Sequence, residues 1–227
     1  MSFKFHQDIF KTRVFYSLYY VLTITFIHSF IVLQNHVLFI SFLSFVMEAN
    51  TAMTVLNELP WFNNLLKDGA WIETSFRMNK SKTEHYVMGK NSPFYFRMAI
   101  SPKNKSILAA VWCGKYATNM GGSVQGGAIS SIFDALTASV GSVQIEPGSF
   151  GTTKNLQVAF LAPTPLLSPL QFSVISATFN ENDGTGIVKA QLTNGTTGKK
   201  YASCTAEMVD LKRRKKWKQQ QKNKAKL

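Results

Sequence analysis

Apolar residues recur along the middle of the chain with two spacings, one typical of helices and the other of strands. The apolar positions 129, 132, 133, 136 and 140 follow one another at helical intervals, which predicts a helix over 128–143 with one apolar face. Residues 52–67 also have helical spacing, and Asp68-Gly69 ends that segment. Runs typical of strands, separated by turns rich in Gly, Pro and Asn, cover 94–100, 106–113, 151–161, 170–179, 186–193 and 200–211.

The order of these elements is two strands, one long helix and then four strands. Because no helix separates the last four strands, we expect them to pair antiparallel. The sequence therefore predicts an α+β fold, in which an antiparallel sheet wraps around one long central helix. We expect the folded domain over 93–211 and a helical lead-in over 47–92, with the part of the lead-in after position 72 polar and irregular.

Residues 1–46 form a separate hydrophobic segment. No Asp, Glu, Lys or Arg lies between positions 14 and 47, and 14–33 is long enough to span the apolar core of a bilayer. Lys4, Lys11 and Arg13 precede this run, which favours a cytoplasmic N-terminus. Three interpretations stay open: a signal anchor, a poorly cleaved targeting segment, or an artefact of the gene model with the true start at Met47. If 1–46 is real we expect a membrane-anchored protein, and otherwise a cytoplasmic or mitochondrial one.

Positive charge is concentrated at the other end of the chain. The formal net charge is +13, and 212–227 contributes nine lysines and arginines without an acid, so the rest of the chain carries only +4. A run of like charges is typical of a solvated, disordered tail. Such a tail also suits an anionic membrane or RNA. The many phenylalanines are expected in the core rather than on a base-stacking surface, so we expect no specific nucleic-acid partner.

The cysteine and histidine content excludes several kinds of site. Cys113 and Cys204 do not make a disulfide framework, and the sequence has no Cys/His ligand cluster. None of the four histidines lies after position 85, so the C-terminal half cannot hold a Ser-His triad or a histidine-ligated metal. Nothing in the sequence implies a metal ion or an organic cofactor.

The candidate chemistry lies where a glycine-rich loop runs into the predicted helix. The first N–H groups of a helix have no partners within it, and Gly126 and Gly127 would let a ligand carbonyl approach them closely. Such amides can form an oxyanion hole for a thioester. Asp134 follows on the same helix, and it is the only acid between Glu84 and Glu146. Its apolar neighbours in the sequence favour burial, which would suit a general base; the alternative is an Asp134 on the solvated side of the helix.

Two segments resemble the hotdog thioesterase family. In that family an H-G-G motif opens the central helix, and Asp or Glu follows on the same helix. The matching residues here are Asn119, Gln125, Gly126, Gly127 and Asp134. The family's next strand carries a hydroxyl residue, then an aromatic residue and two spaced prolines. The matching residues here are Thr153, Phe160, Pro163 and Pro165. The similarity covers roughly 90–211 and is greatest to thioesterase superfamily members four and five, with the phenylacetate-pathway type more distant.

The resemblance implies an acyl-CoA thioesterase that hydrolyses fatty acyl-CoA to free fatty acid and CoA at the interface of a homodimer or homotetramer. Asp134 would act as general base on water or as nucleophile, and the amides of Gly126 and Gly127 would polarise the thioester carbonyl. Thr153, reaching in from the other subunit, would position the water or the carboxylate, with Thr152 as the alternative. Asn119 would support the loop or contact the thioester. The residues implied to contact the substrate are Gln125, Ala159, Leu161, Leu170 and Gln171.

Two departures set this chain apart from the family pattern. Gln125 stands where the family has histidine, although a backbone oxyanion hole does not need that side chain. The hairpin 183–186 reads Asp-Gly-Thr-Gly where member four carries basic CoA contacts, so Lys154, Lys199 or Lys200 would have to bind the phosphates instead. The alternative function is a non-catalytic hotdog dimer that binds acyl-CoA or a protein partner.

Overall fold

The computed structural model describes residues 34, 44, 47–67, 69–74, 87, 92–144, 151–180 and 182–224. The chain divides into two units, 1–49 and 50–227, and the candidate site lies in the second. The expectation of a signal anchor or targeting segment over 1–46 falls outside the described residues, apart from positions 34 and 44. Among the described helices, none is both long and apolar enough to cross a bilayer.

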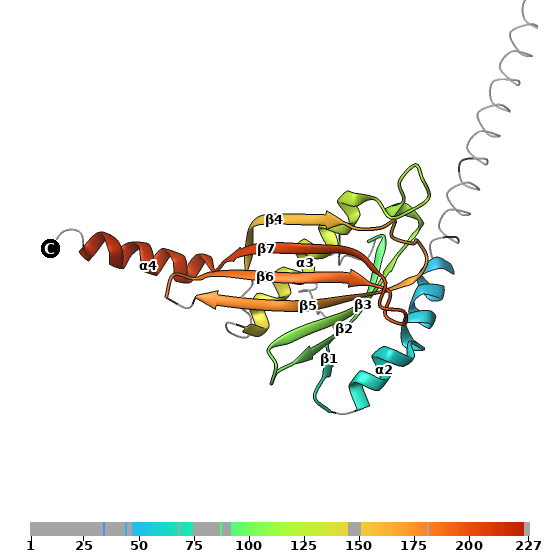
Figure 1. Cartoon of the computed structure of the whole chain (residues 1–227), viewed down its shortest axis with the longest axis horizontal. Coiled ribbons are helices and arrows are strands. Elements are labelled where there is room, and N and C mark those ends of the chain that lie inside the picture. The colour runs from blue at the N-terminus through green and yellow to red at the C-terminus, as the bar shows by residue number, and fades with distance from the viewer. Residues whose placement is uncertain are drawn as a thin grey trace, which may run out of the picture. The chain divides into compact units, whose positions relative to one another are not determined.

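Within the described residues, the second unit is built on one sheet of seven strands (Figure 1). The order is β1-β2-β3-β5-β6-β7-β4, so the strand that follows the central helix in sequence lies at the far edge of the sheet. All neighbouring pairs are antiparallel, as predicted. The strands are β1 (Ile72–Thr74), β2 (Phe94–Ser101), β3 (Ser106–Cys113), β4 (Thr152–Phe160), β5 (Pro169–Asn180), β6 (Thr185–Thr193) and β7 (Lys200–Val209).

Helix α3 (Gly126–Gln144) packs across one face of this sheet. Ile132, Phe133, Leu136 and Val140 are fully buried there, and each such side chain contributes about 1.5–3 kcal/mol by leaving water. The ring of Phe133 meets that of Phe172 on β5, with their centroids 6.1 Å apart. The predicted α+β class is confirmed: one long helix lies against an antiparallel sheet, which is the arrangement of a hotdog fold.

The helical lead-in covers the opposite face of the sheet at β2 and β3. Residues 50–57 are helical, and helix α2 (Pro60–Lys67) follows. Strand β3 is apolar at nearly every position because its alternate residues face two different cores. The buried residues of this second core are Ala52, Leu56, Leu59, Phe62, Ala99, Leu108, Ala110 and Trp112.

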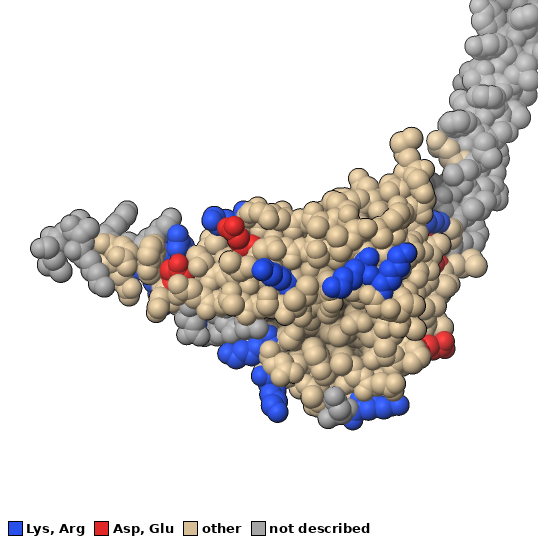
Figure 2. Space-filling view, viewed as in Figure 1, with Lys and Arg blue, Asp and Glu red and all other residues tan. Residues whose placement is uncertain are grey.

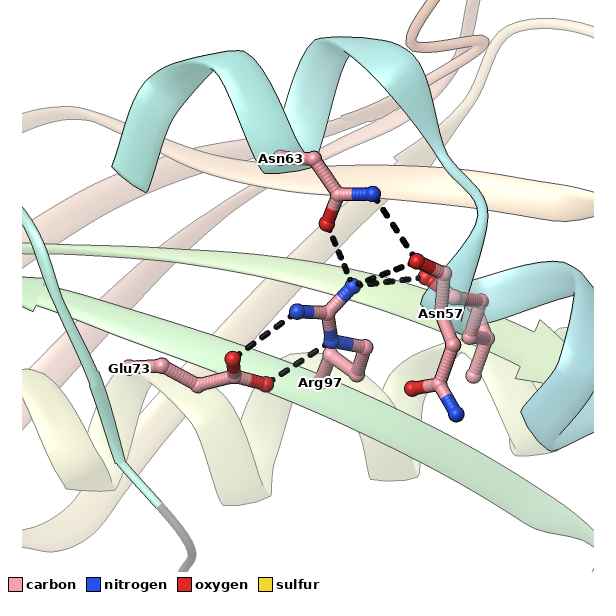
Figure 3. A network of polar contacts seen from close by, with 5 residues as sticks. Asn57, Asn63, Glu73 and Arg97 are labelled. Atoms are coloured by element: carbon pink, nitrogen blue, oxygen red, sulfur yellow. Dashed lines mark hydrogen bonds and ion pairs between the residues drawn. The ribbon is translucent and has the colours of Figure 1, made fainter. Parts of the chain in front are cut away.

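Arg97 on β2 fastens the lead-in to the sheet (Figure 3). Its Nε and one terminal nitrogen donate to the two carboxylate oxygens of Glu73, each at 2.8 Å. The other terminal nitrogen donates to the carbonyl oxygens of Leu56 at 2.9 Å and Asn57 at 3.4 Å, and to the side-chain oxygen of Asn63 at 2.9 Å. One cation therefore joins β1, β2 and both helical segments of the lead-in.

Two segments differ from the prediction. Strand β1, expected as irregular chain, pairs antiparallel with β2. The tail after position 211, expected to be disordered, forms helix α4 (Leu211–Lys224). Lysine, arginine and glutamine are good helix formers, and the carboxylate of Asp210 caps the helix by accepting the N–H groups of Lys212 and Arg213. These local preferences outweigh the repulsion among like charges that led us to expect disorder.

Candidate active site

The glycine-rich loop before α3 is held in place by its own hydrogen bonds. The short helix η1 (Lys115–Ala117) follows β3, and its last carbonyl accepts the N–H of Gln125 at 2.8 Å. The side-chain oxygen of Asn119 accepts the N–H groups of Gly121 and Ser123 at 2.9 and 3.1 Å. Its side-chain nitrogen donates to the Ser123 hydroxyl at 2.8 Å. Asn119 thus supports the loop, which is one of the two roles expected for it.

Helix α3 presents unpaired amides where it begins. In the described part of the chain, no hydrogen bond uses the N–H of Gly126 or Gly127, as the first turn of a helix requires. A Cβ added to Gly126 would lie 3.2 Å from the Phe160 ring, and one added to Gly127 would lie 3.3 Å from Oε1 of Gln125. Glycine at these two positions therefore leaves room for the side chains of Phe160 and Gln125, and these two side chains lie beside the unpaired amides.

Asp134 is exposed on α3 in the single subunit. It shares one stripe of the helix with Gly127, Ser131 and Ala138, since these positions are spaced four, three and four residues apart. Gly127 is exposed and the other two are partly buried. Seven residues separate Asp134 from Gly127, which is roughly 10 Å along the helix at about 1.5 Å per residue. Within one subunit, Asp134 thus lies on the solvated side of the helix and not among the apolar residues that we expected to surround it.

Thr153 lies at the other end of the edge strand β4. Its partly buried hydroxyl faces the sulfur of Met208 at 3.8 Å, and the neighbouring Thr152 is exposed. Seven residues of extended chain separate Thr153 from Phe160, which is roughly 23 Å at about 3.3 Å per residue. Within one subunit, the structure does not bring Thr153 to the start of α3.

The residues expected to contact the substrate do not share one surface. Ala159 and Leu161 are exposed on either side of Phe160. Leu170 has no exposed surface and belongs to the core beside α3. Gln171, the next residue on β5, is partly buried and points to the opposite face of the sheet. Leu170 is a core residue rather than a wall of a surface groove, because the alternation along β5 directs it inward.

The sheet end near Thr153 has its charges paired. Lys154 forms an ion pair with Glu207 at 3.0 Å, and hydrogen bonding from Lys154 lowers the pKa of Glu207. In the hairpin between β5 and β6, a hydrogen bond from the Thr185 hydroxyl lowers the pKa of Asp183, whose carboxylate also pairs with Arg214 at 3.5 Å. The hairpin expected to lack basic CoA contacts thus holds an acid that is used to attach α4.

Two other lysines lie at the Phe160 end of the sheet. Lys199 and Lys200 are exposed where the chain turns from β6 into β7. The carbonyl of Tyr201 accepts the N–H of Leu161 at 2.8 Å, which places this turn beside the end of β4. On the face shown in Figure 2, basic side chains gather over that end of the sheet. Lys199 and Lys200 are therefore better placed than Lys154 to meet an anion near the start of α3 of the same subunit.

Neither cysteine belongs to the candidate site. Cys113 and Cys204 are buried, and burial raises the pKa of each thiol to about 12. Near neutral pH neither supplies a thiolate nucleophile. Over the described ranges, no group of three or more His, Cys, Asp and Glu side chains could hold a metal ion.

No family model matches the chain, and no curated protein matches its sequence. A putative thioesterase from Ralstonia eutropha, related to phenylacetic acid degradation, is 25% identical, with 51% of this chain and 83% of that chain covered and a TM-score of 0.43. The PaaI protein of E. coli is 17% identical, with coverage of 47% and 73% and a TM-score of 0.42. Zebrafish thioesterase superfamily member 2 is 16% identical, with coverage of 46% and 74% and a TM-score of 0.41.

Proposed function

We propose that this protein is an acyl-CoA thioesterase that hydrolyses fatty acyl-CoA to free fatty acid and CoA. The observation that carries the proposal is one stripe of α3, on which the exposed Asp134 shares a helix face with the exposed Gly127, whose amide has no partner among the described residues. Thioester hydrolysis needs a base for the attacking water and a donor for the oxygen that gains negative charge. The carboxylate and the amide supply these two functions.

The separation of these two groups fits the reaction. A chain of atoms runs from the amide nitrogen to the carbonyl oxygen, the carbonyl carbon, the water and the carboxylate. The legs of this chain add up to on the order of 10 Å, given hydrogen bonds of about 2.9 Å and a water held about 3 Å from the carbon, and its span is shorter because the legs meet at angles. The side chain of Asp134 tilts towards the start of the helix, which shortens the distance to be bridged. Gly127 and Asp134 lie roughly 10 Å apart along the helix. The scissile bond would therefore lie over the stripe between them.

A homodimer would complete this site. Strand β4 is an edge strand, paired only with β7 among the described strands. If two copies of β4 pair antiparallel about Leu156, the middle of the strand, Thr152 of the partner subunit comes opposite Phe160 and Thr153 of the partner subunit comes opposite Ala159, one residue from Phe160 and its contact with Gly126. The small residues Ser131 and Ala138 leave room for the partner along the helix. This pairing removes the 23 Å gap of roughly seven strand residues that separates Thr153 from the start of α3 in one subunit.

In the reaction, the amides of Gly126 and Gly127 donate to the thioester carbonyl oxygen. Asp134 takes a proton from water as the water oxygen bonds to the carbonyl carbon. The tetrahedral intermediate then collapses with cleavage of the C–S bond, and the proton passes from Asp134 to the departing sulfur of CoA. Thr153 of the partner subunit would donate its hydroxyl hydrogen to the water or to the carboxylate.

The test is Asp134→Asn in the full chain, assayed by release of free thiol from medium and long acyl-CoA. Removal of the base is expected to lower kcat by about a hundredfold or more. Because Asp134 is exposed, the stability of the subunit is expected to stay within roughly 0.5 kcal/mol of the wild type. Glu58→Gln, at an exposed acid of the lead-in, is the matched control and keeps full activity. Equal hydrolysis by Asp134→Asn and wild type would refute the assignment.

One observation favours the alternative, a hotdog dimer that binds acyl-CoA without turnover. Phe160 and Gln125 fill the spaces beside Gly126 and Gly127 that an approaching carbonyl would use. If neither side chain moves aside, acyl-CoA would raise the melting temperature in proportion to its occupancy while no thiol is released. Turnover well above the rate in buffer rejects this alternative.

A further inference from the structure

Helix α4 is attached to the sheet at its first turn. Asp210 is 6% exposed, and one of its carboxylate oxygens accepts the N–H groups of Lys212 and Arg213 at 2.9 and 3.2 Å. The N–H of Asp210 donates to the carbonyl of Gly184 at 2.7 Å. Gly184 has φ of 68°, and a Cβ there would lie 2.8 Å from the Cβ of Arg213, so only glycine lets the helix approach this hairpin so closely. These contacts hold the first turn of α4 against the β5–β6 hairpin, and the helix extends away from the sheet from there (Figure 1).

The two arginines of α4 are used for this attachment. Arg213 pairs with Asp210, and Arg214 pairs with Asp183, each at 3.5 Å. The guanidinium of Arg214 also lies over the ring of Trp217, with its carbon 4.7 Å from the ring centroid. Trp217 follows Arg213 and Arg214 by four and three residues, so the three side chains lie on one face of the helix.

The lysines of the first two turns are not used in this way. Lys212, Lys215 and Lys216 are exposed, and the helix contains no acid. The sequence adds Lys218, Lys222, Lys224 and Lys226 without one acid among them. The large apolar residues of α4 are only Leu211 and Trp217, too few for a helix that inserts its apolar face into a bilayer. A surface of this kind binds an anionic partner through its charge density.

We propose that α4 is a docking site for an anionic lipid bilayer. Sequence-tolerant binding of single-stranded nucleic acid relies on aromatic rings that stack on bases, and the one ring of α4, Trp217, is covered by Arg214. A bilayer surface requires only a fixed cluster of lysines, because the attraction falls off within a Debye length and does not depend on sequence. The uncharged run 14–46 of the sequence is a second, apolar element, and stable membrane attachment takes two such signals. This inference does not depend on the thioesterase activity.

The test is flotation of the full chain with vesicles of phosphatidylcholine alone and with vesicles in which about 30% is phosphatidylserine. The variant Lys212→Gln/Lys215→Gln/Lys216→Gln is compared with a control of equal net charge, Lys67→Gln/Lys103→Gln/Lys189→Gln, whose lysines are exposed elsewhere on the domain. We expect the α4 variant to lose about a hundredfold in partitioning to the anionic vesicles, the equivalent of about 1 kcal/mol per lysine. The control is expected to change it by less than about threefold, and the loss should disappear at high salt.

A second measurement distinguishes the outcomes even if residues 14–46 make the chain float with vesicles of both compositions. Trypsin cleavage within α4, followed by mass spectrometry, should be slowed by the anionic vesicles and unaffected by the neutral ones. Equal flotation of the two variants together with equal cleavage on both vesicles would overturn the proposal. So would tighter binding of single-stranded RNA than of anionic vesicles at the same ionic strength, if that RNA binding is lost in the α4 variant.

Discussion

Replacing Arg97 by methionine tests the claim that one cation holds the lead-in on the sheet. Methionine keeps most of the volume of the side chain but removes all of its donors. The change breaks two hydrogen bonds to the Glu73 carboxylate and three to neutral oxygens, and the Arg97 side chain is only 10% exposed. Hydrogen bonds that involve a charged group contribute about 1.5–3 kcal/mol net, and the Glu73 carboxylate, whose side chain is 42% exposed, becomes solvated once Arg97 is gone. We expect a loss of about 2–3 kcal/mol, most of it from the partly buried oxygens of Leu56 and Asn63 that lose their donor.

The assay is urea unfolding of the wild type and of Arg97→Met, followed by amide hydrogen exchange. The exchange should accelerate over 50–67 and hardly at all in β5–β7, because the lead-in opens as a local unit before the sheet does. Equal unfolding free energies, or unchanged protection of 50–67, would refute the role given to Arg97.

The pH dependence of Glu73 gives a second check on the same contact. A hydrogen bond from Arg97 lowers the pKa of Glu73 in the folded protein. A carboxyl whose folded pKa is lowered stabilises the protein above its unfolded pKa, and that contribution is lost as the pH falls through the lowered value. Glu73→Gln should therefore be less stable than the wild type near neutral pH and equally stable in acid. A constant difference across that range would show that the ionised form of Glu73 is not what Arg97 stabilises.

Three further predictions concern the site and the attachment of α4. Gly184→Ala should lower the free energy of unfolding more than Gly198→Ala does. Both glycines have positive φ, so alanine at either position costs about 1–2 kcal/mol, but only a Cβ at position 184 lies 2.8 Å from the Cβ of Arg213. Calorimetry of the two variants therefore isolates the cost of that contact. In a double-mutant cycle, Gly126→Ala should lower the unfolding free energy of the wild type more than that of Phe160→Ala, with a coupling energy of about 0.5 kcal/mol or more. A coupling energy of zero would mean that the Phe160 ring does not pack on Gly126. Lys199→Gln/Lys200→Gln should raise KM for acyl-CoA about threefold or more at low salt. KM for acyl-pantetheine should stay the same, because only CoA carries the nucleotide phosphates. An equal rise in KM for both substrates would mean that these lysines do not bind the phosphates.

The elements with a strong period could be predicted from the sequence within two residues. The helix expected over 128–143 runs from 126 to 144, and the strand expected over 106–113 has the same bounds. Both depend on side chains that are buried in one subunit, so the apolar pattern records them directly. Asn119 was named from the family resemblance, and its hydrogen bonds to Gly121 and Ser123 are local, as is usual for residues of a turn.

What the sequence did not predict depends on contacts between distant segments. Three-residue β1 is too short to show a period, and it is ordered by Arg97, far along the chain. Helix α4 is attached by Asp183, and no local pattern connects that hairpin to the tail. The packing of Phe160 on Gly126 and the inward direction of Leu170 follow from strand register. Asp134 shows the same limit, because apolar neighbours in sequence face the sheet while Asp134 itself faces away from it.

Strand β4 is synthesised well before the strand with which it pairs. Residues Thr152–Phe160 lie beside Lys200–Val209, and the whole of β5 and β6 is translated in between. The β5–β6 hairpin can form from local contacts, whereas β4 can pair only after β7 has been synthesised. Until then the inward side chains Leu156 and Val158 have no strand beside them. A nascent chain stalled before residue 200 would therefore display an apolar edge with no strand beside it, which is a site for aggregation and for chaperone binding.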